Sequence, residues 1–251
     1  SGGKRFRPIL TYAVANTFGT ALNLADSSAC AVELIHAYSL IHDDLPAMDD
    51  DDMRHNQPAC HKQFGEAQAI LAGDGLQALA FEVLTKDDSL SAQVRITLLQ
   101  ALTYAAFEMA EGQSIDLSVV SKTINVETLQ DMHLKKTGAL LSCSVKLGAL
   151  VSSQCGVEDQ KILDGFSQDI GLAYQVQDDV LDVLTPEGVL GKKQRSDVDK
   201  NKPTYPALLG LDEATKTYQQ LYQQAFEKLE QLSVDSSELR SLTEQLQSRK
   251  F

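Results

Sequence analysis

The sequence has no long apolar run, and its basic residues are outnumbered by acidic ones. Lys and Arg total 22 against 35 Asp and Glu, so the formal net charge is −13. This balance argues against a nucleic-acid partner, because binding to a phosphate backbone requires clustered Lys and Arg. No apolar stretch approaches the roughly 20 residues that span a bilayer, and no segment has the pattern of a signal peptide. We therefore expect neither a nucleic-acid partner nor stable membrane insertion.

Cysteine is also scarce, and its spacing argues against two common uses of the residue. The four cysteines, at positions 30, 60, 143 and 155, form no CxxC pair and no zinc-like pattern. Free thiols in a reducing compartment are the simplest interpretation, so we expect a cytoplasmic protein. None of the four is a candidate nucleophile.

Proline is limited to six residues, and alternating strand patterns are almost absent. Long segments rich in Ala and Leu instead carry apolar residues at helical spacing. These patterns predict helices at residues 8–18, 27–52, 65–84, 89–113, 126–153, 158–184, 213–232 and 236–248. The sequence contains no repeat, linker or break in composition, and 251 residues can bury one substantial core. We therefore predict an all-α, single-domain bundle of long helices over residues 1–251.

Local signals refine these helices. Asn125 and the pair Asp88-Ser89 are candidate N-caps, because their short polar side chains accept hydrogen bonds from the first free backbone N–H groups. Gly73 and Gly75 interrupt the helix at 65–84, where each costs about 1 kcal/mol relative to Ala. We attribute them to a close approach of two helices.

The most unusual segment is an acidic cluster with six aspartates among residues 43–52, directly after the apolar run 37–41. Two like charges about 4 Å apart repel by roughly 4 kcal/mol at an effective dielectric near 20, so this cluster requires water or cations. A solvated acidic loop is the ordinary explanation for such a run. Arg54, which closes the cluster, and a second acidic cluster downstream favour a cation site instead.

The second cluster lies at residues 175–182, with the sequence QVQDDVLD. Asp178 and Asp182 are four residues apart and share one face of a helix, with Gln175 one turn earlier. Magnesium prefers oxygen ligands and commonly bridges one or two carboxylates to the phosphates of a substrate. Two such carboxylate faces, opposed, would form a clamp for a diphosphate.

These two clusters, DDLPAMD (43–49) and DDVLD (178–182), resemble the aspartate-rich motifs of the trans-isoprenyl diphosphate synthases. The resemblance extends in order over essentially the whole chain, and the first motif is similar in spacing to that of the bacterial farnesyl diphosphate synthases. The other matching segments are GGKRFRP (2–8), FGEAQAILAGD (64–74), KTGALL (136–141) and GKKQRSDVDKNKPTYPALLG (191–210).

The resemblance implies an activity, a cofactor and an assembly. It implies helices around a central cavity, a homodimer, and further N-terminal helices in the full-length protein that this chain lacks. It also implies a prenyltransferase that condenses isopentenyl diphosphate with dimethylallyl or geranyl diphosphate, giving farnesyl diphosphate and pyrophosphate. Three magnesium ions are expected to neutralise the diphosphate groups.

The resemblance also assigns roles to individual residues. The metal ligands would be Asp43, Asp44, Asp49, Asp178 and Asp182. The allylic diphosphate would be bound by Arg54, Lys136, Lys192 and Lys202. The isopentenyl diphosphate would be bound by Lys4, Arg7, His36 and His55. The developing carbocation would face Thr137, Gln175 and the carbonyl group of Lys136.

One segment departs from the family pattern. Arg54-His55-Asn56 stands where relatives usually have Arg-Arg-Gly. Histidine has an unperturbed pKa near 6.5 and is mostly neutral at pH 7, whereas arginine keeps its charge. We therefore expect the Michaelis constant for isopentenyl diphosphate to depend on pH.

Product length is expected to depend on Tyr38 and Ser39, which precede Asp43 by five and four residues. In the resembled family a bulky side chain at this place forms a floor under the growing chain. Because packed interiors do not stretch, an aromatic residue there limits the length of the product. Tyr38 followed by Ser39 fits a fifteen-carbon product.

Several alternatives remain open at this level. A geranylgeranyl diphosphate synthase is one alternative. A non-catalytic subunit of a heteromeric synthase should have lost aspartates, and none is missing here, but the change at His55 keeps this alternative open. A class I terpene cyclase is disfavoured by DDVLD at 178–182 and by GGKRFRP at 2–8. A metal-dependent phosphohydrolase would need further His or Asp ligands, for which His133 is a poor candidate.

Overall fold

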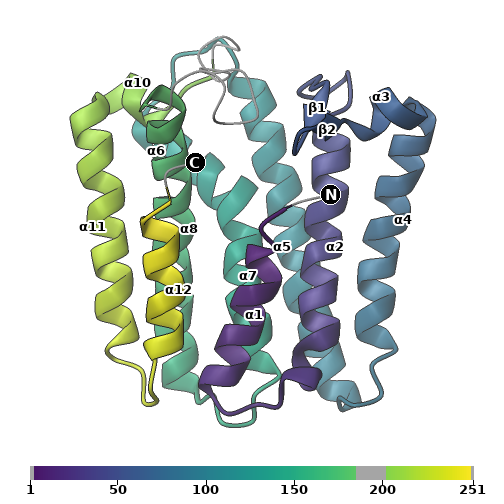
Figure 1. Cartoon of the computed structure of the whole chain (residues 1–251), viewed down its shortest axis with the longest axis vertical. Coiled ribbons are helices and arrows are strands. Elements are labelled where there is room, and N and C mark those ends of the chain that lie inside the picture. Colours follow the sequence, from purple (N-terminus) through teal and green to yellow (C-terminus); the bar gives the residue numbers. More distant parts are fainter. Residues whose placement is uncertain (1–2, 185–201, 250–251) are drawn as a thin grey trace.

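The computed structural model describes residues 3–184 and 202–249, which form a bundle of long helices standing side by side (Figure 1). The all-α fold predicted from the sequence is confirmed. The helices are α1 Phe6–Thr17, α2 Asp26–Asp43, α3 Cys60–Phe64, α4 Glu66–Thr85, α5 Ala92–Val119, α6 Val126–His133, α7 Ala139–Leu150, α8 Val157–Leu184, α10 Tyr205–Leu209, α11 Leu211–Leu229 and α12 Ser237–Gln247. A 3-10 turn η1 spans Leu22–Ala25, a π-helix η2 spans Leu134–Gly138, and strands β1 and β2 are Met53–Arg54 and Gln57–Pro58.

The centre of the bundle is α7, which packs against α1, α5 and α8. The pair α2 and α4 lies on one side, and the pair α8 and α11 lies on the other (Figure 1). Leu98 and Leu102 of α5 and Leu147 of α7 are fully buried in the core cluster that joins the first side to the centre. Within the described ranges, no helix is both long and apolar enough to cross a membrane.

The first aspartate cluster is not helical throughout, so the prediction of one helix over residues 27–52 is wrong. Helix α2 ends at Asp43, and residues 44–52 form turns, bends and irregular backbone. Pro46 explains the ending, because it lacks a backbone N–H group and disfavours helical geometry in the residue before it. The acidic segment therefore bends back across the end of the bundle that also carries β1, β2 and α3 (Figure 1).

A two-residue hairpin follows the acidic segment. Arg54 of β1 pairs with Gln57 of β2 in an antiparallel register. The intervening His55 and Asn56 both have positive φ values, 49° and 59°. Positive φ at both central residues is the signature of the tight turn that suits a hairpin, and Asn tolerates this region better than most residues. The turn fixes the direction in which Arg54 leaves the backbone.

The predicted helix at 126–153 contains an irregularity, since the π-helix η2 separates α6 from α7. A Cβ atom on Gly112 of α5 would lie 2.2 Å from the backbone N of Lys136, and one on Gly171 of α8 would lie 3.1 Å from the Cα of Gly138. The backbones of α5, η2 and α8 are therefore in direct contact. Single π turns of this kind occur frequently at functional sites.

The local signals are confirmed only in part. Asn125 caps α6, since its Oδ1 accepts a hydrogen bond from the backbone N of Thr128 at 2.9 Å. Helix α5 begins later than predicted and is capped by Ser91 rather than by residues 88–89. Gly73 marks a close approach, because a Cβ there would lie 2.0 Å from Nε2 of His42. Gly75 does not, since a Cβ there would meet nothing within 4 Å.

Candidate active site

A cavity of about 700 Å³ opens between α2, α5, η2 and α8, and we refer to it as the main cavity. It collects most of the residues that the sequence assigned to the site. Those residues are Arg7, Tyr38, Ser39, Asp43, Asp49, Arg54, Lys136, Thr137, Gln175, Asp178, Asp182 and Lys202. Lys192 lies outside the described residues. Segments that are far apart in the sequence thus converge on one space.

The two aspartate motifs supply opposite walls of the main cavity. Asp43 stands at the end of α2 and Asp49 in the following turns, whereas Asp178 and Asp182 lie one turn apart on α8. Burial raises the pKa of Asp43 to about 6, with the carboxylate of Asp49 adding to this effect and Lys136 opposing it. The cavity therefore concentrates carboxylate groups at a place where an added cation would be stabilised.

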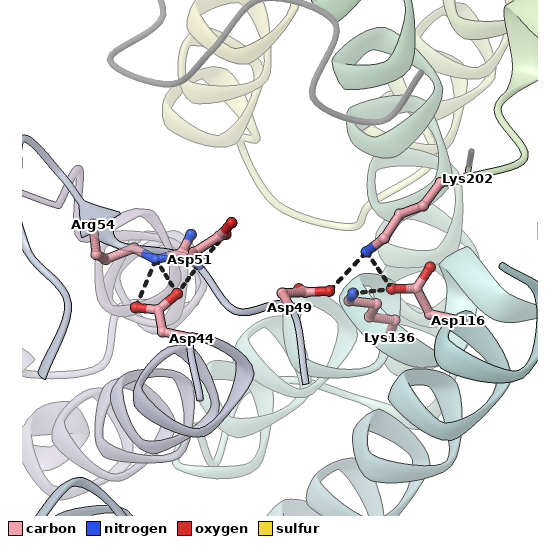
Figure 2. Close-up of polar contacts among 7 residues, drawn as sticks. All are labelled: Asp44, Asp49, Asp51, Arg54, Asp116, Lys136 and Lys202. Carbon is pink, nitrogen blue, oxygen red and sulfur yellow. Dashed lines mark hydrogen bonds and ion pairs between the residues drawn. The ribbon is translucent and has the colours of Figure 1, made fainter. Parts of the chain in front are cut away.

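In the first Asp-Asp pair, the two side chains have different surroundings. Asp43 lines the main cavity, but Asp44 is only 2% exposed and does not line it. Asp44 instead accepts hydrogen bonds from Arg54, whose Nε lies 3.0 and 3.2 Å from the two carboxylate oxygens (Figure 2). Asp51 also lies 3.5 Å from Nη2 of Arg54. The contact that the structure gives Asp44 is thus with Arg54, and its role as a metal ligand stays a prediction.

The second Asp-Asp pair repeats this division. Asp178 lines the main cavity, whereas Asp179 is buried and does not. The Oδ2 of Asp179 accepts a hydrogen bond from the backbone N of Tyr205 at 2.9 Å and lies 3.3 Å from Nε2 of His133. In each motif, therefore, the first aspartate faces the cavity and the second fixes a neighbouring element.

A buried carboxylate on α5 connects two of the predicted lysines. Oδ2 of Asp116 lies 2.6 Å from Nζ of Lys136 and 2.8 Å from Nζ of Lys202, which is also 3.0 Å from Oδ1 of Asp49 (Figure 2). Burial alone would raise the pKa of Asp116, but the ammonium groups of Lys136 and Lys202 outweigh it, so this pKa lies below its usual range. The carboxylate thus stays charged and holds both ammonium groups at the cavity.

Sequence reasoning missed Asp116, because the predicted helix ended three residues before it, and it assigned no role to Gln113. The sequence does contain a pattern that could have indicated both residues. The apolar stripe of α5, which includes Leu102 and Met109, continues at helical spacing onto these two polar residues, and both are buried. A polar side chain in a core position is informative, since burial of such a group requires a partner.

The remaining cationic residues divide between two spaces. Arg54 and His55, together with Arg5 and His36, line a side groove of about 400 Å³ next to the main cavity. Arg54 lines both spaces, so its guanidinium group forms part of the wall between them. Burial, followed by the positive charges of Arg7, His55 and other groups, lowers the pKa of His36 to about 2. His36 is therefore a neutral hydrogen-bonding group in the free protein.

Two N-terminal residues predicted to bind isopentenyl diphosphate differ in placement. Lys4 is exposed, whereas Arg7 lines the main cavity. Burial lowers the pKa of Arg7, and its Nε has no hydrogen-bond partner among the described residues. A buried guanidinium nitrogen without a partner fits an anion-binding role, because an anion would satisfy it.

Tyr38 has the burial that a floor requires. Its side chain is 8% exposed, lines the main cavity and meets the ring of His42 edge-on, with the ring centroids 5.7 Å apart. His42 is in turn held by the carbonyl oxygen of Ile70, 3.0 Å from its Nε2. The phenol is therefore packed against a supported neighbour, and its role in product length stays a prediction.

The C-terminal segment also reaches the second motif. Arg249 places its guanidinium carbon 3.7 Å from the ring centroid of Tyr174, and its Nη1 lies 3.3 Å from Oδ1 of Asp178. Its Nε donates to Oε1 of Gln177 at 3.1 Å. Asp178 therefore has an internal cationic partner, as Asp49 has in Lys202.

The donor chemistry of the main cavity fits magnesium. Among the residues that the structure describes, no three His, Cys, Asp or Glu side chains converge closely enough to hold a metal by themselves. Carboxylates nevertheless face one another across the cavity, and a positive group, the ammonium of Lys202, is already stable between Asp49 and Asp116. Magnesium suits such a site when substrate phosphates and waters complete its coordination.

Comparison with known proteins identifies the class. The family model described as polyprenyl synthetase matches residues 1–240. The sequence is 48% identical to the farnesyl diphosphate synthase of Escherichia coli (strain K12), an alignment that covers 99% of this chain and 85% of that protein. It is 42% identical to the geranylgeranyl diphosphate synthase of Cyanophora paradoxa, over 91% of this chain and 77% of that one.

Solved structures agree with this assignment. A geranyltransferase from Helicobacter pylori, complexed with magnesium and isoprenyl diphosphate, superposes with a TM-score of 0.86 at 33% identity, covering 98% of this chain and 83% of that one. The chain belongs to the polyprenyl synthetase family. Within it, the chain is a prenyltransferase of the farnesyl diphosphate synthase type. The family and the enzyme class predicted from the sequence are thereby confirmed.

Proposed function

We propose that this protein condenses isopentenyl diphosphate with dimethylallyl or geranyl diphosphate, and that farnesyl diphosphate is its final product. The observation that carries this proposal is the opposition of two carboxylate faces, Asp43 with Asp49 and Asp178 with Asp182, across one cavity that also exposes basic groups. A polyanionic diphosphate is held in such a space only with cations between it and the carboxylates.

The proposed metal set uses the aspartates that line the main cavity. Three magnesium ions would be held chiefly by Asp43, Asp49 and Asp178, with Asp182 in support. Asp44 would also support the metal set, and in the free protein it fixes Arg54. When bound, the ions supply the positive charge that makes the diphosphate a good leaving group.

The protein's own residues bind and orient the two substrates. Arg54, Lys136 and Lys202, with Lys192, would hold the allylic diphosphate, while Lys4, Arg7, His36 and His55 would hold the isopentenyl one. The bond between C1 of the allylic chain and the diphosphate oxygen breaks, and the electron pair leaves with the diphosphate. Thr137, Gln175 and the carbonyl group of Lys136 would then face the positive charge with neutral dipoles, which stabilise it without trapping it.

Condensation completes the reaction. The double bond of isopentenyl diphosphate forms the new carbon–carbon bond to C1, and a proton is lost from the isopentenyl unit. The released pyrophosphate is the proposed proton acceptor, since among the described residues that line the main cavity no His or Glu is placed as an obvious base. His42 is the histidine that lines it, and its ring is held against Ile70.

We also propose a homodimer in the cytoplasm. Large apolar side chains are exposed on α4 and α5, including Leu71 and Phe107, which are 63% and 65% exposed. Exposed apolar residues of this size support an interface between two copies. The free thiols of the cysteines support a reducing compartment. Light scattering of the purified protein, with Phe107→Glu as the interface variant, would measure the assembly.

The deciding experiment is a product assay. The protein is incubated with isopentenyl and geranyl diphosphates, with and without magnesium, and the products are separated by chain length. A magnesium-dependent fifteen-carbon diphosphate is the expected result. Products of twenty carbons would favour the geranylgeranyl alternative, and absence of condensation would favour a subunit that requires a partner.

A further inference from the structure

Gln113 stands out in the main cavity because both ends of its amide are unsatisfied. The side chain is 7% exposed and lines the cavity. Neither Nε2 nor Oε1 has a hydrogen-bond partner among the described residues. A buried polar group left in this state costs about 1 to 3 kcal/mol, so a sequence that keeps it there gains something in return.

The position of Gln113 along α5 indicates what it faces. Met109 lies one turn before it and also lines the cavity, while Asp116, one turn after it, holds Lys136 and Lys202. With a rise of about 1.5 Å per residue, Gln113 lies roughly 4 to 6 Å along the helix from each of these neighbours. It therefore stands between the apolar part of the cavity and the part proposed to hold the diphosphate.

In the proposed reaction, positive charge develops at the boundary between these two parts of the cavity. The bond that breaks joins the apolar allylic chain to its diphosphate, and the positive charge appears on the carbon side of that bond. Lys136 and Thr137 line the cavity from η2, and Gln175 lines it from α8. Gln113 adds a third element, α5, to the wall around this point.

The chemistry of a carboxamide suits the place. Its oxygen carries partial negative charge but no formal charge, so it attracts a cation without forming a stable bond to it. Rotation about the last side-chain torsion, which is broad for Gln, turns the oxygen toward the cavity. The donor end of the amide then points away from the positive charge.

We propose that Gln113 is a further catalytic residue, whose amide oxygen stabilises the allylic cation formed when the diphosphate leaves. The inference rests on the proposed prenyl transfer. Because the interaction strengthens only as charge develops, it lowers the barrier of the chemical step and contributes little to ground-state binding.

The test compares Gln113→Met with the wild-type protein. Met has nearly the same length and volume but cannot satisfy or require the two hydrogen bonds. We expect kcat for geranyl diphosphate with magnesium and isopentenyl diphosphate to fall roughly ten- to hundredfold, with KM values within about threefold of wild type. We expect Tm of the free variant to be equal to or higher than that of wild type, because a buried unsatisfied amide has been removed.

The combination of a lower kcat with an undiminished Tm is the signature of a catalytic rather than a structural amide. A kcat within twofold of wild type would overturn the proposal, and so would a lower Tm, because that result means the amide is satisfied in the free protein. Gln100→Met, at an exposed position of the same helix, is the matched control and should change neither quantity. If wild type itself makes no product, the proposed function fails rather than this inference.

Discussion

Nζ of Lys202 lies 2.8 Å from Oδ2 of Asp116, a residue 86 positions earlier in the chain. The contact is largely protected from solvent, since the two side chains are 13% and 4% exposed. The same ammonium group is 3.0 Å from Asp49, so one internal cation joins the first aspartate motif to α5. The free protein thus balances its own carboxylates with lysine, at the place where metal is proposed to bind.

Removal of this ammonium group should strengthen metal binding in the absence of substrate. Lys202→Gln removes a charge that competes with a metal ion for Asp49. A partly buried ion pair contributes on the order of 1 kcal/mol, so we expect the Kd for Mn²⁺ to fall about five- to tenfold. Titration calorimetry on the substrate-free protein measures this Kd. Lys216→Gln, which removes an exposed lysine paired with Glu213, should leave the Kd unchanged. An unchanged Kd in Lys202→Gln would refute the competition.

Tyr38→Ala should lengthen the product. The substitution removes a phenol that is buried at the wall of the main cavity and leaves space for a longer chain. We expect products of twenty carbons or more from isopentenyl and geranyl diphosphates, separated by reversed-phase chromatography. Tyr104→Ala, at an exposed position away from the main cavity, should keep the wild-type product. If the Tyr38→Ala enzyme still stops at fifteen carbons, Tyr38 does not limit the length of the product.

Two glycines on α4 should respond to alanine in opposite ways. At Gly73 the new methyl group would collide with the ring of His42, and such overpacking costs about 1 to 3 kcal/mol. At Gly75 it would meet nothing within 4 Å, and alanine in a helix interior gains up to about 1 kcal/mol over glycine. Urea unfolding of both variants gives the free energies. A stabilised Gly73→Ala would contradict the close approach of α2 and α4.

His55 should make the binding of isopentenyl diphosphate dependent on pH. His55 lines the side groove with Arg5, His36 and Arg54. An arginine at this position would keep its charge over the same pH range. We expect the KM for isopentenyl diphosphate to be higher at pH 8 than at pH 6, because an unperturbed imidazole is mostly neutral at pH 8. The same profile measured for His55→Arg serves as the control, because it contains the titration of the substrate's own phosphate groups but not that of His55. If KM for isopentenyl diphosphate changes with pH in the same way for wild type and His55→Arg, then His55 does not bind this substrate.

His36 should make the folded protein sensitive to acid. Its pKa of about 2 in the folded state lies below the 6.5 of an unfolded chain, so the unfolded state takes up a proton that the folded state does not. The contribution of His36 to the free energy of unfolding is fully present well above pH 6.5. It is lost as the pH falls, by about 2 kcal/mol at pH 5. His36→Gln should lose about 2 kcal/mol less than wild type between pH 7 and pH 5, measured by urea unfolding. Equal losses would mean that His36 takes up its proton in the folded state.

Much of the site could be predicted because its residues sit in motifs with a fixed order. Asp43 and Asp178 face the main cavity as expected from their motifs. Helical periodicity likewise predicted most helix spans, since apolar stripes determine which faces are buried. The turns after Asp43 do not follow from periodicity, because Pro46 rather than the apolar pattern ends the helix.

The rest depended on contacts that no local pattern encodes. The pairing of Asp44 with Arg54 follows from the hairpin turn at His55 and Asn56, which sequence reasoning did not predict. The joining of Lys202 to Asp116 requires the folded chain, since it links distant segments. The π turn at Lys136 is set by the backbone of α5 at Gly112, a neighbour in space alone.

The glycines of that region have a mechanical consequence. At Gly112 and Gly171 the backbones of α5 and α8 touch η2 with no side chain between them, so no rotamer change can absorb a displacement there. We therefore expect the three elements to move as one rigid body, together with Gln113, Lys136 and Asp178. Any widening of the cavity would then occur at the opposite wall, where α2 ends and the acidic turns begin.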